Sequence, residues 1–233
     1  MFHMGHVAAS ESKAMQVSFA VKKTIEEPLF GLIFPKVKPS KDEKWADCEW
    51  RVKGCTGKDP TFQARGRRGD LLGARLNFLG LDDLIKQEEA EAKDIAESEL
   101  EAIIRWLRLT AMTRLDAPGA SAWMCHTRWV EEDPPGWAQA QGWTVLHIRA
   151  VTDEGTSYWP ERYPIGELER LRLEDPEAFY LQFMGEPNIS EGGDLKRHHF
   201  QRFDYLPSEQ YCVVHAWDTA GTVNPRSDFT AGW

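Results

Sequence analysis

The stretch Leu76-Asn-Phe-Leu-Gly-Leu-Asp-Asp83 decides the fold that we expect for this chain. It is an apolar run of strand length that ends in two adjacent carboxylates, and its length and flanking loops favour a buried strand. At the carboxyl end of a parallel sheet such acids lie where ligands bind. Two adjacent carboxylates repel each other, and a divalent cation relieves that repulsion. The same pattern is also typical of a strand end followed by a helix cap.

The segments that follow this stretch predict an α/β fold with a parallel sheet. A long helix is expected over residues 88–110, because its acidic first half and the arginines near its end suit the helix dipole. Further buried strands are expected at residues 122–127 and 144–150. The resulting order of strand, helix, strand, connection and strand is typical of a parallel sheet with helical crossovers.

The residues before this stretch give weaker signals. Apolar residues at helical spacing predict a helix over residues 10–27, with Ser10 as its cap and Pro28 at its end. A strand is expected within residues 45–52. Residues 55–73 are rich in Gly, Lys and Arg and are therefore predicted to form a loop.

The last third of the chain differs from the rest. Residues 151–210 are charged and punctuated by prolines, with one helix expected near residues 165–184, which favours a connector. Two strands joined by a short polar turn, one ending at Asp218 and one starting at Asp228, suggest a hairpin that opens a new domain. We therefore expect three parts, residues 1–150, 151–210 and 211–233.

Composition excludes several classes of protein. The chain has 233 residues, of which 42% are hydrophobic and 28% are charged, so wholesale disorder is not expected. The sequence has no apolar run long enough to span a membrane and no secretory signal in its first thirty residues. Its 4 cysteines are scattered without a CxxC pair, which excludes a disulfide scaffold or zinc ribbon and fits a reducing cytosol.

Charge is distributed unevenly along the chain. The net charge is −9, but residues 1–75 hold 14 basic and 9 acidic groups, whereas residues 76–104 hold 2 basic and 9 acidic groups. The chain as a whole therefore lacks the basic signature of a nucleic-acid-binding protein. The local cluster Arg65-Gly-Arg67-Arg68 could contact phosphate, and a solvated loop is the alternative.

Other candidate sites are weaker. Asp218 ends a strand and Asp228 begins the next, which is how a two-metal nuclease site starts, although acids in a hairpin loop are equally expected. The segment Gly54-Cys-Thr-Gly57-Lys58-Asp59 has the wrong glycine spacing for a phosphate-binding loop. The histidines in His3-Met-Gly-His6 and His198-His199 lack supporting ligands, and His126 at a strand end is a weak catalytic candidate; we interpret all of them as structural or surface residues.

Several motifs in fixed order resemble the large subunit of tailed-bacteriophage terminases. They include Pro60-Thr-Phe-Gln-Ala-Arg-Gly66, Leu79-Gly-Leu-Asp-Asp-Leu-Ile-Lys86 and Met124-Cys-His-Thr-Arg-Trp129. Downstream, Phe179-Tyr-Leu-Gln-Phe-Met-Gly-Glu-Pro187 and Ala216-Trp-Asp-Thr-Ala220 follow in the same order. The resemblance covers nearly the whole chain.

The resemblance implies a DNA-packaging motor. Its fold would be a partial P-loop (RecA/ASCE-like) ATPase sheet in residues 1–150, followed by the connector and the first hairpin of an RNase H-like nuclease domain. ATP hydrolysis would drive double-stranded DNA into the procapsid, and a metal-dependent endonuclease would cut the concatemer. ATP and Mg²⁺ would be the cofactors. The partners would be DNA, the portal protein, the small terminase subunit and further copies in a ring, in the host cytoplasm.

The resemblance also assigns roles to residues. Asp82 would bind Mg²⁺, Asp83 would be the catalytic carboxylate, and Thr127 would lie in the motif that couples hydrolysis to movement. Arg75, and less securely Arg67 or Arg68, would contact nucleotide phosphate within or between subunits. Asp218 would be the first metal-binding acid of the nuclease, with Asp228 on the adjacent strand.

The sequence departs from the family in two ways. Asn77 stands where the family often has an acid. The Walker A loop would precede residue 1 and most of the nuclease would follow residue 233, so we expect little ATPase or nuclease activity from this chain alone. The alternatives are a non-catalytic DNA-binding or assembly module and a fragment of an unrelated P-loop-type helicase.

Overall fold

The structure is a computed structural model that describes residues 2–40, 43–69, 71, 73–86, 97–115 and 118–187, and the backbone of 217–218 and 231–232. By its internal contacts the chain divides into two units, Met1–Gly193 and Asp194–Trp233. Each unit is described by itself.

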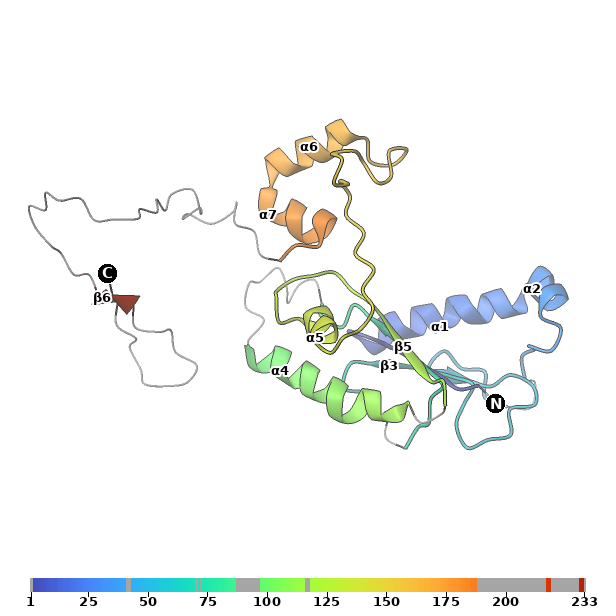
Figure 1. The fold of residues 1–233 in the computed structure, drawn as a ribbon. Helices are drawn as coiled ribbons and strands as arrows, with labels where there is room; N and C mark the ends of the chain where they lie inside the picture. Colours follow the sequence, from blue (N-terminus) through green and yellow to red (C-terminus); the bar gives the residue numbers. More distant parts are fainter. Residues whose placement is uncertain are drawn as a thin grey trace, which may run out of the picture. The chain divides into compact units, whose positions relative to one another are not determined.

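The first unit is built on a five-stranded sheet with the order β2-β3-β1-β4-β5 (Figure 1). Four of these strands are parallel, and β2 alone runs antiparallel to its neighbour β3. The strands are β1 (Met4–Ala8), β2 (Glu49–Trp50), β3 (Phe62–Gly66), β4 (Phe78–Asp82) and β5 (Ser121–Cys125). The predicted α/β class is confirmed, with a mixed sheet that is mostly parallel.

Helices cover the sheet and continue after it. The regular helices are α1 (Glu11–Glu26), α2 (Pro28–Ile33), α4 (Glu97–Trp106), α5 (Pro134–Ala140), α6 (Ile165–Glu174) and α7 (Pro176–Phe179). Tighter or wider turns extend two of them: η1 (Leu107–Ala111), η2 (Met112–Arg114) and η3 (Tyr180–Met184). No helix in the described residues is long and apolar enough to cross a membrane.

The core has two halves, one on each face of the sheet. Side chains alternate between the faces of a strand, so Val7 and Ala8 of β1 point to opposite sides. Val7 packs with Leu79 and Leu81 of β4 and with Ile103 and Leu107 from the α4 side. A second cluster joins Ala8 to residues of α1 and β3, namely Ala14, Ile25, Phe62 and Ala64. The helices α1 and α4 therefore flank the sheet on opposite sides (Figure 1).

Several sequence predictions are confirmed. The run 76–83 contains β4, and the run 122–127 contains most of β5. Helix α1 begins after Ser10, whose hydroxyl accepts a hydrogen bond from the Lys13 amide at 3.3 Å. The helix expected near 165–184 is present as α6, α7 and η3, with a break at Asp175 before Pro176. Of the helix expected at 88–110, residues 88–96 lie outside the described residues.

Two predictions were wrong. The loop expected at residues 55–73 contains β3, a parallel strand between β1 and β2. The strand expected at 144–150 does not form, because a strand exists only where another backbone pairs with it, and this segment joins no sheet of the described chain. Its apolar side chains instead lie exposed, with Leu146 84% accessible.

No strand was expected near the start of the chain, but the structure places β1 there. This strand lies in the middle of the sheet and pairs with both β3 and β4. It is only five residues long and contains Gly5 and His6, which interrupt the apolar pattern that would indicate a buried strand.

The second unit contributes a short antiparallel pair. Strand β6 (Trp217–Asp218) pairs with β7 (Ala231–Gly232), with Asp218 opposite Ala231. The two paired segments fall within the hairpin expected from the sequence.

Candidate functional site

The carboxyl ends of the four parallel strands form one edge of the sheet. The strand register places Gly66, Ala8, Asp82 and Cys125 in one row across β3, β1, β4 and β5. Residues that immediately follow these positions lie at the same edge. In open α/β sheets this edge is where ligands bind, and Asp82 lies near its middle.

Asp83 is fixed to the neighbouring strand by two hydrogen bonds. Its amide donates to the Cys125 carbonyl at 3.0 Å, and its carboxylate Oδ1 accepts from the Thr127 amide at 3.2 Å. Its backbone has a φ of +39°, which a residue other than glycine adopts rarely and at a cost in free energy. The fold therefore holds an exposed carboxylate in a strained conformation at the end of β4, joined to the loop after β5.

His6 lies on the same face of the sheet as Asp82. The imidazole is buried, with 7% of its side chain exposed, and its Nε2 lies 3.8 Å from Asp82 Oδ2. Nε2 has no hydrogen-bond partner in the described part of the chain. Burial lowers the pKa of His6, and the nearby Asp82 carboxylate opposes this shift in part. The imidazole is therefore neutral near pH 7.

The sheet has room for this histidine because of a glycine. In the strand register, His6 of β1, Gly80 of β4 and Trp123 of β5 lie side by side. A Cβ added to Gly80 would lie 3.1 Å from His6 Nδ1 and 3.0 Å from Trp123 Nε1. The His6 and Trp123 rings therefore occupy the space that a side chain at position 80 would need. This packing leaves His6 close to Asp82.

Two arginines follow β3 at this edge and share one acidic partner. The Arg67 guanidinium donates to the Leu84 carbonyl at 3.0 Å and pairs with Glu99 at 3.2 Å. The Arg68 guanidinium pairs with the other oxygen of Glu99 at 2.9 Å. Glu99 thus compensates part of the positive charge of Arg67 and Arg68.

Arg75 lies at the opposite edge. It precedes β4, whose amino end pairs with the amino ends of β1 and β5, whereas Asp82 is at the carboxyl end. Within one chain the structure thus brings Arg67, and not Arg75, to the edge that carries Asp82 and Asp83. Arg67 reaches this edge because it directly follows β3. A loop was predicted in place of β3, so this position could not be identified from the sequence.

The segment Gly54–Asp59 also lies at the amino edge. It leads into β3, and the residue before that strand, Thr61, accepts a hydrogen bond from the Met4 amide at the start of β1. This position is far from the acids of β4. The interpretation that the segment is no phosphate-binding loop therefore agrees with its place in the fold.

A buried carboxylate supports the loop that carries Thr127. Asp133 is fully buried and accepts hydrogen bonds from the Trp129 amide at 2.8 Å and the Gly136 amide at 2.9 Å. It also pairs with Arg128 Nε at 3.0 Å. Asp133 therefore caps α5 and fixes residues 128 and 129, directly after the Asp83–Thr127 contact.

Two further side chains at this edge, those of Cys125 and His126, are weak candidates for a catalytic role. Burial raises the pKa of the Cys125 thiol, and the Asp82 and Asp83 carboxylates raise it further, so this cysteine is a poor nucleophile at neutral pH. The His126 Nδ1 contacts the Thr127 carbonyl at 2.5 Å, which ties the ring to its own loop.

The residues at this edge fit a magnesium ion in part. Mg²⁺ is usually held by one or two carboxylates, by water and by substrate phosphates. Asp82 presents a carboxylate that is 35% exposed, and Asp83 supplies a second one from the adjacent position. No group of three or more acidic, histidine or cysteine side chains able to hold a metal occurs among the described residues. The remaining ligands of such an ion would be water and phosphate.

The nuclease candidates lie in the second unit. The backbone of Asp218 is in β6, as the sequence predicted. Asp228 lies outside the described residues, so the pairing of the two acids stays a prediction.

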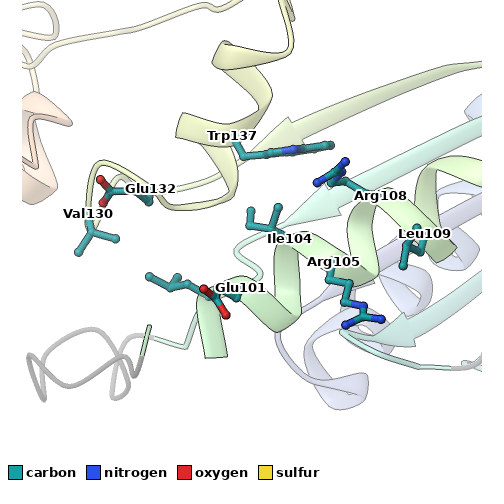
Figure 2. A pocket seen from close by; sticks show the side chains of 9 residues that line it. Glu101, Ile104, Arg105, Arg108, Leu109, Val130, Glu132 and Trp137 are labelled. Carbon is teal, nitrogen blue, oxygen red and sulfur yellow. The ribbon is translucent and has the colours of Figure 1, made fainter. Parts of the chain in front are cut away.

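A separate groove of about 1100 Å³ lies between α4 and α5. Figure 2 shows Trp137 of α5 facing Ile104 of α4 and Arg108 of η1. Leu100 and Ile104 of α4 are partly buried and line this groove. Among the described residues, none of Asp82, Asp83 and Thr127 lines it.

Neither a scan against protein-family models nor a search of the curated proteins finds a match to this chain.

Proposed function

We propose that this chain is part of a terminase large subunit, and that the carboxyl edge of β4 is the half of its ATP site that binds Mg²⁺ and orients the attacking water. One observation carries the proposal. Asp82 ends β4, an interior parallel strand, and Asp83 follows it with its carboxylate hydrogen bonded at 3.2 Å to the Thr127 amide in the loop after β5.

The roles follow from the geometry of this edge. Asp82 would hold Mg²⁺, and the exposed Asp83 carboxylate would accept a proton from, or orient, the attacking water. Thr127 would report the state of the site to the loop after β5, because its amide bonds directly to Asp83. A cation must offset the charge that develops on the transferred phosphoryl group. Arg67 stands at this edge, whereas Arg75 would have to act from another subunit.

The chain would need a phosphate-binding element from elsewhere. The printed sequence contains no GxxxxGK[ST] loop. Backbone amides of such a loop normally hold the β- and γ-phosphates of ATP. We therefore propose that this chain alone binds Mg²⁺ with nucleotide weakly and turns it over slowly or not at all.

The wider assignment is part of the same proposal. Asp218 and Asp228 would begin the metal site of an RNase H-like endonuclease, and the assembled motor would act on double-stranded DNA in the host cytoplasm. The portal protein, the small subunit and further copies of the chain would be its partners. The order of motifs along the sequence supports this assignment.

Binding of a fluorescent ATP analogue to the 233-residue chain, with and without Mg²⁺, tests the ATP site. We expect weak binding that requires Mg²⁺, that Asp82→Asn abolishes and that the surface control Asp153→Asn leaves unchanged. The control is suitable because the Asp153 side chain is 86% exposed and lies outside the sheet. Binding that is independent of both Mg²⁺ and Asp82 would contradict the proposal.

Phosphate release in the presence of double-stranded DNA completes the test. Turnover that Asp83→Ala abolishes would overturn the expected inactivity of the chain while supporting the role of Asp83. Absence of nucleotide binding, combined with salt-dependent DNA binding that survives loss of Asp82, Asp83 and Asp218, would instead favour a non-catalytic DNA-binding module.

A further inference from the structure

Helix α2 carries apolar side chains on its exposed surface. None of its residues is buried. Leu29, Leu32 and Ile33 are spaced three and four residues apart, so they share one face of the helix, and Leu32 is 79% exposed. Phe34 is half exposed and extends this surface beyond the end of α2. We call these four residues the α2 patch. An exposed apolar surface of this kind is typical of a site that contacts another molecule.

Opposite charges stand at the two ends of the α2 patch. Glu27 is exposed directly before α2, and Lys36 and Lys38 are exposed shortly after it. Within the described residues none of these three side chains forms an ion pair. The α2 patch is therefore an apolar strip with a negative and a positive end.

The groove between α4 and α5, here called the α4–α5 groove, offers an apolar surface that is long enough for α2. Its lining includes the partly buried side chains of Leu100, Ile104 and Trp137. The stretch of chain from Leu100 to Leu109 that lines the groove is about 13 Å long, whereas α2 is about 9 Å long. The groove therefore has room for the whole of α2.

Opposite charges also stand at the two ends of the α4–α5 groove. Glu101 lies near the start of α4, and Figure 2 shows Glu132 at this end. Arg105 and Arg108 follow along α4 and η1, toward the other end of the groove (Figure 2). The groove is thus negative where α4 begins and positive where α4 ends.

The α2 patch and the α4–α5 groove lie on opposite faces of the sheet. Phe30 of α2 packs against the core cluster that joins α1 to the sheet. Ile104 and Trp137 pack against the core cluster on the other face. Because the sheet separates the two surfaces, the α2 patch can reach such a groove only on another copy of the chain.

We propose that the α2 patch of one copy docks into the α4–α5 groove of a second copy, with α2 antiparallel to α4. This orientation places Glu27 at the arginine end of the groove and the two lysines at its glutamate end. An apolar centre with charged groups at the rim is typical of an interface between proteins, and complementary charges fix the orientation of the partners.

The proposed contact is head-to-tail. Each copy offers its patch on one face and its groove on the other, so each copy can bind two others. The inference rests on the proposed function in one respect, namely that further copies of the chain are among the partners. It deepens that function by assigning the surfaces through which the copies meet.

Sedimentation velocity of two variants of the 233-residue chain, alone and mixed, tests the inference. Leu32→Glu places a charge in the α2 patch and leaves the groove intact, whereas Leu109→Glu places a charge in the groove and leaves the patch intact. Leu32 and Leu109 are 79% and 62% exposed, so both variants should fold. All proteins carry Leu146→Lys, which removes an exposed apolar side chain outside both surfaces.

We expect the protein without these two changes to form assemblies larger than a dimer as its concentration rises. Each variant alone should associate at least about tenfold more weakly, because a charge replaces a central apolar contact. An equimolar mixture of the two variants should form a dimer and nothing larger, because it pairs one intact patch with one intact groove.

Two controls test the surfaces independently of these variants. Leu173 is as exposed as Leu32 but lies on α6, so Leu173→Glu should leave the association unchanged. Lys36→Glu and Glu132→Lys should each weaken the association about threefold. The double variant Lys36→Glu/Glu132→Lys should recover it, because the two charges that meet across the interface are exchanged.

Three results would overturn the inference. The first is a protein that stays monomeric at every concentration, including one whose α2 patch instead binds vesicles of phosphatidylserine in a Leu32-dependent way. The second is a Leu109→Glu variant that dimerises alone, since the patch would then contact a second patch. The third is a mixture of the two variants that associates no better than either variant alone.

Nucleotide binding by the wild-type chain separates this inference from the proposed function. If binding of the fluorescent ATP analogue requires Mg²⁺ and Asp82 but the association does not follow the expected pattern, the inference fails and the proposed ATP site stands. If the association follows the pattern and no nucleotide binds, the proposed ATP site fails and the contact between α2 and the groove stands.

Discussion

At the residue scale, single small or buried groups set the geometry of the edge that carries Asp82 and Asp83. Gly80 leaves the space that His6 and Trp123 fill, and the contacts across it are already close. Asp83 sits at a positive φ, held by its bonds to the end of β5. The position of each acid thus depends on neighbours from two other strands.

Gly80→Ala should destabilise the fold. The added Cβ would lie 3.0 Å from Trp123 Nε1 and 3.1 Å from His6 Nδ1, so both rings must move within a packed layer. Overpacking of this kind costs about 1–3 kcal/mol. Urea denaturation measures the change. Gly31→Ala is the control, because nothing lies within 4 Å of its added Cβ in helix α2, and it should be neutral or slightly stabilising.

His6 should make the stability of the metal-free protein depend on pH. Burial lowers its pKa below the ordinary value of 6.5, so the unfolded chain binds a proton more readily than the folded protein. The stability is therefore complete above about pH 6.5 and decreases as the pH falls below that value. Urea denaturation at several pH values between 7.5 and 5.5 measures the free energy of unfolding. This free energy should decrease more steeply with falling pH in wild type than in His6→Gln. An identical decrease in both proteins would contradict a lowered pKa for His6.

At the element scale, the loop after β5 and the start of α5 depend on one buried carboxylate. Asp133 joins the cap of α5 to the Arg128 guanidinium and the Trp129 amide. Close packing reinforces this arrangement, because a Cβ added to Gly136 would overlap the Glu131 carbonyl oxygen. The loop that carries Thr127 is therefore fixed by the contacts of Asp133 with the residues that follow Thr127.

Asp133→Ala should destabilise the protein by about 3–5 kcal/mol, because it leaves Arg128 without the partner of a buried ion pair. Asp175→Ala is a matched control. Asp175 also caps a helix, through the Ala178 amide at 3.0 Å, but at an exposed site, where the cost is about 1 kcal/mol. Thermal or urea unfolding of both variants gives the comparison, and equal losses would contradict the role given to the buried pair.

The elements also show where sequence patterns succeed. The runs that contain β4 and β5 are apolar and end in polar residues, so their strand character is visible locally. Strands β1 and β3 contain the polar residues His6, Gln63 and Arg65, which interrupt the apolar pattern of a buried strand. Arg65 of β3, for example, pairs with Glu49 of β2 at 2.9 Å. A pattern that depends on a partner distant in the sequence cannot be read from the strand alone.

At the scale of the whole first unit, β5 ends the sheet, and no described strand pairs with its outer side. The Ser121 amide donates to Asn77 of the β4 side, and the Cys125 carbonyl accepts from Asp83. By the alternation of a strand, the main-chain groups of Ala122 and Met124 point to the side away from β4. Together with the exposed apolar segment 144–150, this edge favours association of the chain.

Leu146→Lys should reduce self-association without loss of stability. Leu146 is 84% exposed in a segment that forms no helix or strand, so the lysine meets no packed neighbour and its charge opposes pairing with another strand. Leu173→Lys is the control, since Leu173 is 79% exposed but lies on helix α6. Sedimentation velocity at several concentrations should show a smaller aggregated fraction for Leu146→Lys only. A similar decrease in both variants would show that added charge alone is responsible.

The sequence by itself determined that an apolar strand ends in Asp82 and Asp83, that Ser10 caps a helix, and that the fold is α/β, because these features depend on neighbours within a few residues. Only the tertiary structure placed His6 beside Asp82, bonded Asp83 to Thr127, and put Arg67 rather than Arg75 at the same edge. Those juxtapositions depend on strand order and register. Both are set by burial and backbone pairing between segments that lie far apart in the chain, and no local pattern specifies them.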